Sequence, residues 1–354
     1  MSARCSFLVP GDLNTRTGGF TYDRHIVDGL RAQHWQVDVR SLGGRWPMPD
    51  ASSEAMAHRI VEAIPDGGLA VVDGLAFGAM PELAEAHAQR LRWVALVHHP
   101  LSLETGLQPA TQRALFESER RALASARGVI VTSPSTARAL AAFDVQASSI
   151  AVVEPGTEPA PLAAGSGASG VSFLCVATVT PRKGHNLLVE ALAGLRDRRW
   201  TLHCAGSMTM DPSCAGAFVE AIGRQGLAER IVLHGEQDEA GLRALYARAD
   251  AFVLPSFHEG YGMALAEALA HGLPVISTSA GAIPDTVPVD AGVLVPPGDG
   301  PALRAALQRL MDDADWRARL SAGARAARQR LPTWADSATR FATALGAFQG
   351  VPRG

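Results

Sequence analysis

Two glutamates flank a glycine-rich turn in the second half of the chain, and their spacing suits the binding of a diphosphate. Glu259 precedes the run Gly260, Tyr261 and Gly262, and Glu267 follows eight residues after Glu259. An apolar run before the turn predicts a buried strand, and an alanine-rich run after it predicts a helix. The first turn of a helix offers unpaired amide groups and a partial positive charge, which together bind phosphate. Eight helical residues rise about 12 Å, so one carboxylate could lie on each side of a diphosphate.

Glu267 has two interpretations. It is either a solvated helix carboxylate or a ligand-binding group within an apolar helix. Its neighbours are Leu265, Ala266, Ala268 and Leu269. Because a glutamate is rarely buried without a partner, this setting favours a ligand for Glu267, and the combined motif favours one for Glu259.

A cationic turn follows the first apolar run of the second half. Arg182 and Lys183 lie in the segment Pro181–His185, between a predicted strand and a predicted helix. An arginine offers a fork of donors and a lysine offers a point charge, and both suit a diphosphate. Taken alone, the two residues are ordinary solvated loop cations. Together with the two glutamates they predict a phosphate site that includes at least Lys183.

The first half of the chain has two further candidate positions. Gly18 and Gly19 lie between a predicted strand and a predicted helix, where they allow a phosphate to approach the backbone, although a purely geometric turn explains them equally well. His98 and His99 end a predicted strand, at the sheet edge where parallel sheets bind ligands. Adjacent side chains on an extended segment point in opposite directions, so the pair is poorly placed to hold one metal ion. We expect His98 to form hydrogen bonds in a binding site rather than to be a core histidine.

No metal site is expected. Asp313 and Asp315 form an Asp-x-Asp triplet, which holds a divalent ion on some nucleotide sugars, but nearby arginines indicate an exposed charged helix. The four cysteines contain no Cys-x-x-Cys pair, which argues against zinc and thioredoxin-type sites. The turn at Gly18 lacks the Gly-x-Gly-x-x-Gly spacing, so a NAD-dependent dehydrogenase is a weak alternative.

Short apolar runs alternate with runs of helical period, which is typical of parallel sheets covered by helices. In the first half the predicted strands are 5–9, 35–39, 69–72, 93–97 and 129–131, and the predicted helices are 23–33, 54–63, 81–90 and 109–126. In the second half the predicted strands are 171–177, 200–205, 231–234, 251–254, 274–277 and 292–295, and the predicted helices are 186–195, 216–226, 239–249 and 262–271. Further helices are predicted from 300 to about 349, with an interruption at Pro332.

These elements predict two doubly wound α/β domains of Rossmann type that face each other across a cleft. Residues 155–170 are rich in Gly, Pro, Ser and Ala without periodicity, and we expect a loose linker there. The domains are expected at 1–158 and 159–334, with the helix at about 335–354 packed back on the first domain.

Composition excludes several classes of protein. The chain has 354 residues, 47% of them hydrophobic, which is enough for more than one core. The net charge is −3 without a long basic block, so no nucleic-acid partner is expected. No run is long enough to cross a bilayer as a helix, and the first residues do not form a secretion signal. We expect a reduced, cytoplasmic protein without a transmembrane segment, and a peripheral membrane contact stays open.

The sequence resembles the retaining glycosyltransferases of family 4 (group 1), which have the GT-B fold. Glu259 and Glu267 match the E-x7-E motif of that family, and Pro181–His185 is similar to its lysine-bearing phosphate loop. The run Leu233–Ser256 resembles the segment that leads into the motif. The resemblance extends through nearly the whole chain and is strongest from Val171 to about Val295.

The resemblance implies a role for each matching position. Glu267 would bind the ribose hydroxyls, and Glu259 would contact the donor sugar with help from backbone amides at 260–262. Lys183 and Arg182 would neutralise the diphosphate. The remaining implied contacts are Gly19 with the diphosphate or the sugar, His98 with the reacting sugar, and Gly235 and Glu236 with the base. Many members have Gly-Arg or Gly-Ser after the strand where this chain has Ala177 and Thr178, so either Arg182 or Thr178 would supply the second phosphate contact.

The function implied by the resemblance is transfer of a sugar from a nucleotide-diphosphate sugar, most simply a UDP-sugar, to an acceptor hydroxyl with retention of configuration. The first domain would bind the acceptor and the second domain the donor. No cofactor or metal is expected. A soluble small-molecule acceptor is favoured over a lipid because the chain has no strongly basic amphipathic helix. Two alternatives stay open: a nucleotide-sugar epimerase that transfers nothing, and a catalytically silent nucleotide-sugar binding protein.

Overall fold

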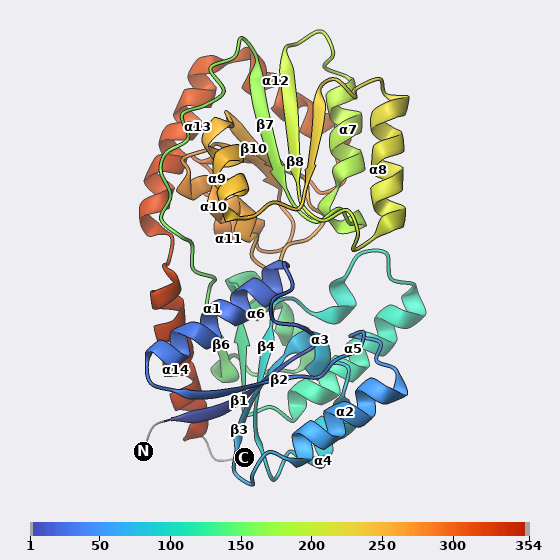
Figure 1. Cartoon of the computed structure of the whole chain (residues 1–354), viewed down its shortest axis with the longest axis vertical. Coiled ribbons are helices and arrows are strands. Elements are labelled where there is room, and N and C mark those ends of the chain that lie inside the picture. Colours follow the sequence, from blue (N-terminus) through green and yellow to red (C-terminus); the bar gives the residue numbers. More distant parts are fainter. Residues whose placement is uncertain (1–2, 351–354) are drawn as a thin grey trace. The chain divides into compact units, whose positions relative to one another are not determined.

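The apolar runs of the first half form one parallel sheet. The computed structural model describes residues 3–350. Six strands pair in the order β2-β1-β3-β4-β5-β6, and every pair is parallel (Figure 1). They are β1 Arg4–Val9, β2 Gln36–Ser41, β3 Leu69–Asp73, β4 Arg92–Val97, β5 Gly128–Val131 and β6 Ile150–Val152.

Helices cover both faces of this sheet, which explains why its strands read as continuous apolar runs. Alternate residues of a strand point to opposite faces. On β1, Phe7 packs in a cluster with Ile26 and Phe341, whereas Leu8 packs on the other face in a cluster with Val61. The helices are α1 Gly18–Ala32, α2 Ala51–Glu62, α3 Gly74–Phe77, α4 Pro81–Ala86, α5 Pro109–Ala124, α6 Pro134–Ala139 and α14 Trp334–Gln349, and short 3-10 turns span Leu101–Leu103, Leu140–Phe143 and Ala147–Ser149.

The second half forms another six-stranded parallel sheet, in the order β12-β11-β10-β7-β8-β9. Its strands are β7 Val171–Val176, β8 Trp200–Ala205, β9 Ile231–Gly235, β10 Ala251–Leu254, β11 Val275–Thr278 and β12 Gly292–Val295. Its helices are α7 His185–Ala193, α8 Pro212–Arg224, α9 Glu239–Arg248, α10 Met263–Ala270, α11 Ile283–Thr286, α12 Gly300–Asp312 and α13 Ala314–Ala327, and 3-10 turns span Pro181–Lys183 and Arg328–Arg330. β7 and β10 are neighbours, so the segments that follow these two strands begin at the same edge of the sheet.

The chain divides into two units. Unit 1 contains Met1–Gly156 and Pro332–Gly354, and unit 2 contains Thr157–Leu331. Within unit 1, α14 packs on α1 so closely that a Cβ added to Gly29 would lie 2.3 Å from the Cβ of Ala338. The doubly wound α/β architecture predicted from the sequence is confirmed for both units.

The segment predicted as a loose linker has no helix or strand, but it is bound to unit 2. The amide of Ala163 donates to the carbonyl oxygen of His271 at 2.8 Å, and that of Ala164 donates to the carbonyl oxygen of Ala247 at 2.9 Å. The hydroxyl of Ser166 donates to a carboxylate oxygen of Asp250 at 2.6 Å. The prediction of a loose linker is therefore wrong for this part, because these hydrogen bonds hold the backbone without any periodic apolar pattern.

The predicted helix boundaries need one correction that concerns a candidate site. The first helix was expected at 23–33 but α1 begins at Gly18, because Thr17 is its N-cap and its hydroxyl oxygen accepts a hydrogen bond from the amide of Phe20 at 3.4 Å. Gly18 and Gly19 therefore form the first turn of a helix instead of a loop. β6 and α6 have no counterpart in the prediction, since both are short.

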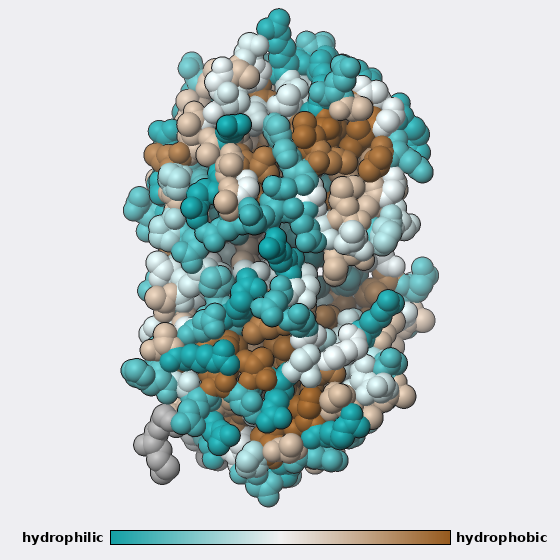
Figure 2. Space-filling view, viewed as in Figure 1, coloured by the Kyte–Doolittle hydropathy of each residue, from teal (hydrophilic) through white to brown (hydrophobic). Residues whose placement is uncertain are grey.

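Apolar surface on the visible face occurs in separate patches surrounded by hydrophilic residues (Figure 2). Exposed large apolar side chains include Met48, Met210 and Val289. Within residues 3–350, no helix combines the length and the hydropathy that a membrane crossing requires.

Candidate functional site

The cationic turn of unit 2 is fixed against the segment that follows β10. Gly184 has a φ of 72°, and a Cβ added to it would lie 2.3 Å from the carbonyl oxygen of Pro255. The amide of Phe257 donates to the carbonyl oxygen of Arg182 at 2.7 Å. Only glycine allows this close approach, and the approach places Arg182 and Lys183 beside Glu259.

Four side chains then form a charged group that we call the lysine cluster: Arg182, Lys183, Ser256 and Glu259. The ammonium group of Lys183 donates to Oε1 of Glu259 at 2.6 Å, and the hydroxyl of Ser256 donates to the same oxygen at 2.6 Å. The guanidinium of Arg182 lies 3.4 Å from Oε2 of Glu259 and donates to the carbonyl oxygen of His258 at 2.8 Å. Lys183 is also the only lysine in a chain with 32 basic residues.

Two positive charges keep Glu259 ionised although it is only 6% exposed. Burial alone would favour its neutral form, but Lys183 and then Arg182 outweigh burial and lower the pKa of Glu259 to about 2. Burial lowers the pKa of Lys183 in turn, and Glu259 partly offsets that effect. The cluster thus has a net charge of +1 with all three groups ionised, which suits an anionic ligand.

The turn before α10 is held by its backbone. α10 begins at Met263, directly after Gly262, whose φ of 93° is in the left-handed region. A Cβ on Gly281 would lie 2.3 Å from the carbonyl oxygen of Glu259, and the amide of Ala282 donates to that oxygen at 2.8 Å. The hydroxyl of Thr286 donates to the carbonyl oxygen of Tyr261 at 2.6 Å, which fixes the turn further. Gly260 lies between Glu259 and Tyr261, the two residues whose carbonyl oxygens accept these hydrogen bonds.

Glu267 has a partner that the sequence did not reveal. The hydroxyl of Tyr246, on α9, donates to Oε2 of Glu267 at 3.0 Å. Burial raises the pKa of Glu267, and the hydrogen bond from Tyr246 opposes that rise. Tyr246 itself is fixed by stacking on His271, with ring centroids 4.8 Å apart. Glu267 is therefore half-buried and oriented, rather than a solvated helix carboxylate.

The two residues expected near a base lie at the end of β9. Gly235 has a φ of 65°, and its carbonyl oxygen accepts a hydrogen bond from the amide of Gly206 at 2.9 Å. Glu236 follows and is exposed. Thr178, which was expected to share the second phosphate contact with Arg182, follows β7 and is partly buried. Of these two, Arg182 is the one that contacts Glu259.

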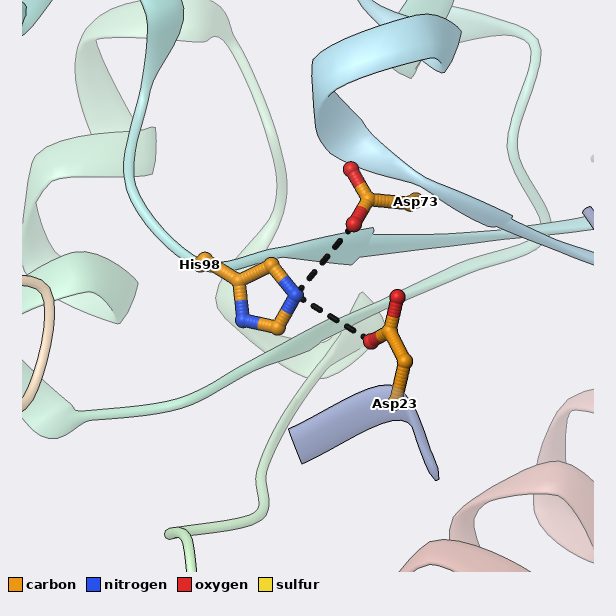
Figure 3. Close-up of side chains that lie close together, drawn as sticks. All are labelled: Asp23, Asp73 and His98. Carbon is orange, nitrogen blue, oxygen red and sulfur yellow. Dashed lines mark hydrogen bonds and ion pairs between the residues drawn. The ribbon is translucent and has the colours of Figure 1, made fainter. Parts of the chain in front are cut away.

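Unit 1 contains a second group of interacting side chains, which we call the histidine cluster: Asp23, Asp73 and His98 (Figure 3). Nε2 of His98 lies 3.2 Å from Oδ1 of Asp23 and 3.4 Å from Oδ2 of Asp73. Asp73 ends β3 and His98 follows β4, which is the neighbouring strand, whereas Asp23 comes from α1. Both carboxylates are buried, and the His98 side chain keeps 22% exposure.

The charges of the histidine cluster are coupled. Burial opposes protonation of His98, but its hydrogen bonds and ion pairs with Asp23 and Asp73 outweigh burial and raise the pKa of His98 to about 10. Burial and the charge of Asp73 raise the pKa of Asp23 to about 7, against the opposing effect of His98. A Cβ added to Gly19 would lie 3.5 Å from Cδ2 of His98, so the first turn of α1 lies directly beside the ring.

The other residues considered for metals have partners of their own. His99 faces Glu104, with Nε2 and Oε2 3.3 Å apart, so the two adjacent histidines do contact different groups. Asp313 is the N-cap of α13 and accepts a hydrogen bond from the amide of Trp316 at 2.8 Å, which accounts for its place in the Asp-x-Asp triplet. One candidate oxygen or nitrogen from each member of the histidine cluster lies within 4.8 Å of the other two, which a divalent ion could also span. The direct contacts already account for this arrangement, and the expectation of no metal stays a prediction.

Four residues that contact the candidate site residues were not predicted from the sequence: Tyr246, Ser256, Asp23 and Asp73. Asp73 had a usable signal, because it ends a buried strand just as His98 follows one. Asp23 interrupts the apolar stripe of α1, three and four residues before Ile26 and Val27, and it is itself buried. A carboxylate within such a stripe indicates a buried partner.

Two family models match the chain, one mainly in each unit. The model described as Glycosyltransferase Family 4 matches residues 69–160, and the model described as Glycosyl transferases group 1 matches residues 170–313. Together the two matched segments include more than half of the chain.

Curated proteins with similar sequences are described as glycosyltransferases. A D-inositol 3-phosphate glycosyltransferase of Salinispora tropica is 30% identical over 66% of this chain and 55% of its own length. An MMP alpha-(1->4)-mannosyltransferase of Mycolicibacterium hassiacum is 27% identical over 62% of this chain and 56% of its own length. The chain thus spans a little over half the length of these two curated relatives.

Solved structures show the same fold. Sucrose-phosphate synthase of Thermosynechococcus elongatus has a TM-score of 0.82 at 23% identity, over 96% of this chain and 98% of that chain. HepE of Anabaena, in complex with UDP-glucose, has a TM-score of 0.76 at 18% identity, over 97% of this chain and 99% of that chain. The fold is GT-B, and by its two matching family models the chain belongs to the group 1 glycosyltransferases of family 4.

Proposed function

We propose that the protein transfers a sugar from a nucleotide-diphosphate sugar to an acceptor hydroxyl, with retention of anomeric configuration and without a metal ion. The observation that carries the proposal is the lysine cluster, where two cations meet one ionised carboxylate at the edge of the sheet where β7 and β10 end. UDP is the proposed nucleotide, which the UDP-glucose complex of the structural neighbour HepE supports.

Unit 2 would bind the donor. Lys183 and Arg182 bind the diphosphate, because a group with several negative charges competes well for cations that share a single carboxylate. Glu267 is held by Tyr246 and binds the ribose hydroxyls through its carboxylate oxygens. Glu259 is fixed through its backbone as well as its side chain, and it orients the sugar.

The charges also favour departure of the nucleotide. The transition state of glycosyl transfer resembles an oxocarbenium ion that separates from its leaving group. Preorganised cations next to the diphosphate stabilise the charge that develops there. Glu259 is a weak nucleophile, since both Lys183 and Ser256 donate to one of its oxygens. We therefore propose attack of the acceptor hydroxyl on the face from which the nucleotide leaves, without a covalent intermediate: the bond between C1 and the phosphate oxygen breaks, the bond between C1 and the acceptor oxygen forms, and the hydroxyl proton passes to the departing phosphate. NMR analysis of the product anomer tests this, and an inverted product refutes it.

The single lysine permits a direct test of the phosphate site. Pyridoxal phosphate followed by borohydride forms a stable adduct with amines, and the chain has one ε-amino group, on Lys183. We expect UDP to protect Lys183 from this labelling, as measured by peptide mass spectrometry, with the α-amino group as an internal control. Equal labelling of Lys183 with and without saturating UDP would contradict the assignment.

Two variants separate binding from turnover. Lys183→Ala should lower kcat about 100-fold or more, as expected when a group that stabilises transition-state charge is lost, whereas Glu267→Ala should mainly weaken nucleotide binding. Glu220→Ala, at an exposed position of α8, is the matched control and should change neither. Calorimetry with UDP and a coupled assay for nucleotide release measure the two effects, and normal activity in both site variants would overturn the site.

A panel of UDP-, GDP-, ADP- and dTDP-sugars separates the proposed function from its two alternatives. A transferase releases nucleotide faster when an acceptor is added. An epimerase converts the donor sugar without net release of nucleotide, and a silent binding protein is stabilised by a nucleotide but turns over none of the donors.

A further inference from the structure

Nε2 of His98 faces two buried carboxylates, and this geometry leaves the other ring nitrogen on the opposite side. Figure 3 shows Nδ1 on the side of the ring that points away from both aspartates. None of the hydrogen bonds found among residues 3–350 involves Nδ1 of His98, and the side chain is 22% exposed. The ring therefore presents one nitrogen to the protein interior and one to the surface.

The interior side is rigid. Oδ1 of Asp73 accepts a hydrogen bond from the amide of Leu75 at 2.7 Å, so this carboxylate is fixed by the start of α3. The ring of Tyr22 lies edge-on to the ring of His98, with centroids 5.3 Å apart, and the Tyr22 hydroxyl donates to the carbonyl oxygen of Val153 at 2.9 Å. The hydroxyl of Thr132 donates to the carbonyl oxygen of His98 at 3.1 Å. His98 thus has little freedom to rotate.

The groups that face the His98 ring are mostly acidic. α1 contributes Asp23 and the neutral Tyr22, and the end of β3 contributes Asp73. The adjacent residue His99 pairs with Glu104, whose side chain is 40% exposed. No arginine is paired with Asp23 or Asp73 in the described part of the chain, so His98 is the cation that offsets part of their charge.

We propose that Asp23 and Asp73 are positioning residues that keep His98 in its doubly protonated form, so that the Nδ1–H group donates a hydrogen bond to a substrate oxygen and His98 does not act as a base. Two buried carboxylates favour the doubly protonated ring, because loss of the proton from either ring nitrogen would leave them without a cation. The role of His98 in catalysis rests on the proposed function, because same-face attack requires no protein base. The protonation of His98 can be measured without any substrate.

NMR of the full chain labelled with ¹⁵N tests the protonation state. His98→Gln identifies the His98 signals among the 11 histidines. We expect both ring nitrogens of His98 to stay protonated at pH 8, in line with the pKa raised to about 10, and we expect Asp73→Asn or Asp23→Asn to bring the transition down toward the ordinary value of 6.5. Titration of His98 near 6.5 in the wild-type chain would overturn the proposal.

A pH profile separates positioning from a merely structural effect. In the wild-type enzyme, turnover should not fall between pH 6 and 8 because of His98. In Asp73→Asn, turnover should fall up to about tenfold as the pH rises through the lowered pKa of His98, since the donor is lost. A uniform loss at every pH would mean that Asp73 is only structural. Asp23→Asn provides the second variant if Asp73→Asn does not fold, and His99→Gln is the matched control.

A metal titration tests the alternative that the three side chains of the histidine cluster bind a metal ion. Mn²⁺ and Zn²⁺ are added to the ¹⁵N-labelled chain, and the His98 signals are followed. Unchanged signals at millimolar concentration support a hydrogen-bonded cluster. Site-specific broadening by Mn²⁺, or a shift of Nε2 by Zn²⁺, that disappears in Asp23→Asn would replace the proposal by a metal site. Neither the NMR titration nor the metal titration depends on whether the protein transfers a sugar. A failure of this proposal can therefore be distinguished from a failure of the proposed function.

Discussion

At the scale of single residues, the ion pairs of the lysine cluster contribute to the stability of unit 2. Glu259 is buried and ionised because Lys183 and Arg182 lie beside it. Removal of either member of a buried ion pair leaves a charge without a partner, which is usually strongly destabilising. Variants in this cluster should therefore be compared in stability as well as in activity.

The acid stability of unit 2 should reflect Glu259. Its pKa falls from the ordinary value of 4.5 to about 2 in the folded chain, so the stabilising contribution is fully present above about pH 4.5 and is lost as the pH falls toward 2. We expect the unfolding free energy of Glu259→Gln to depend less steeply on pH in this window than that of the wild type. Denaturant titrations at several pH values measure the slope, with Glu220→Gln as the exposed control; equal slopes in all three proteins would contradict the ion pair.

The candidate residues that the sequence allowed us to predict are those in local patterns. Glu259, Glu267 and the Arg182–Lys183 pair stand at fixed distances along the chain from predicted strand ends. Tyr246 contacts Glu267 across two helices, and Asp23 reaches His98 from 75 residues away. Spacing along the chain does not encode such contacts, so they became visible only in the fold.

At the scale of elements, the strands were easier to predict than the ends of the helices. β8, β10 and β12 have the bounds predicted from their apolar runs. The start of α1 was missed by five residues, since the cap at Thr17 offsets the low helix propensity of Gly18 and Gly19. The last helix was predicted to pack back on the first domain, but its contact with α1 was not, because that contact depends on which small residues face each other.

The contact between α1 and α14 makes a specific prediction. In Gly29→Ala the added methyl group would lie 2.3 Å from the Cβ of Ala338, so the helices must separate and we expect a loss of about 1–3 kcal/mol in the unfolding free energy. The double variant Gly29→Ala with Ala338→Gly exchanges the two residues and should recover part of that loss. Gly346→Ala, where an added Cβ meets no neighbour, is the control and should be neutral or stabilising. Thermal denaturation measures all four proteins, and a stable Gly29→Ala without rescue would contradict the packing.

At the scale of the whole molecule, unit 1 is built from two separate parts of the chain. Its second part contributes Phe341, Leu345 and Phe348 of α14 to the core on one face of the sheet. Burial of each such side chain stabilises a fold by about 2 kcal/mol, and a domain has only about 5–15 kcal/mol in total. Unit 1 therefore depends on α14, whereas unit 2 is continuous.

Truncation after Leu331 should affect the two units differently. We expect the amides of β1, β3 and β4 to lose their protection in hydrogen exchange, because their sheet has lost the cover of one face. The amides of β7, β8 and β10 should keep theirs, since Thr157–Leu331 contains all of unit 2. Mass spectrometry of exchanged peptides measures both sets at once, with the full-length chain as the reference. Full protection of β1 in the shortened chain would show that α14 is dispensable.

The divided unit 1 also has a consequence for the order of events on the ribosome. The chain emerges from its amino end, so residues 157–331 leave the ribosomal exit tunnel before the closing helix of the other unit does. Unit 1, which contains the histidine cluster, cannot complete its fold until residues 334–349 leave the exit tunnel. A premature stop between Leu331 and Trp334 would leave unit 2 whole and attached to an unfinished unit 1.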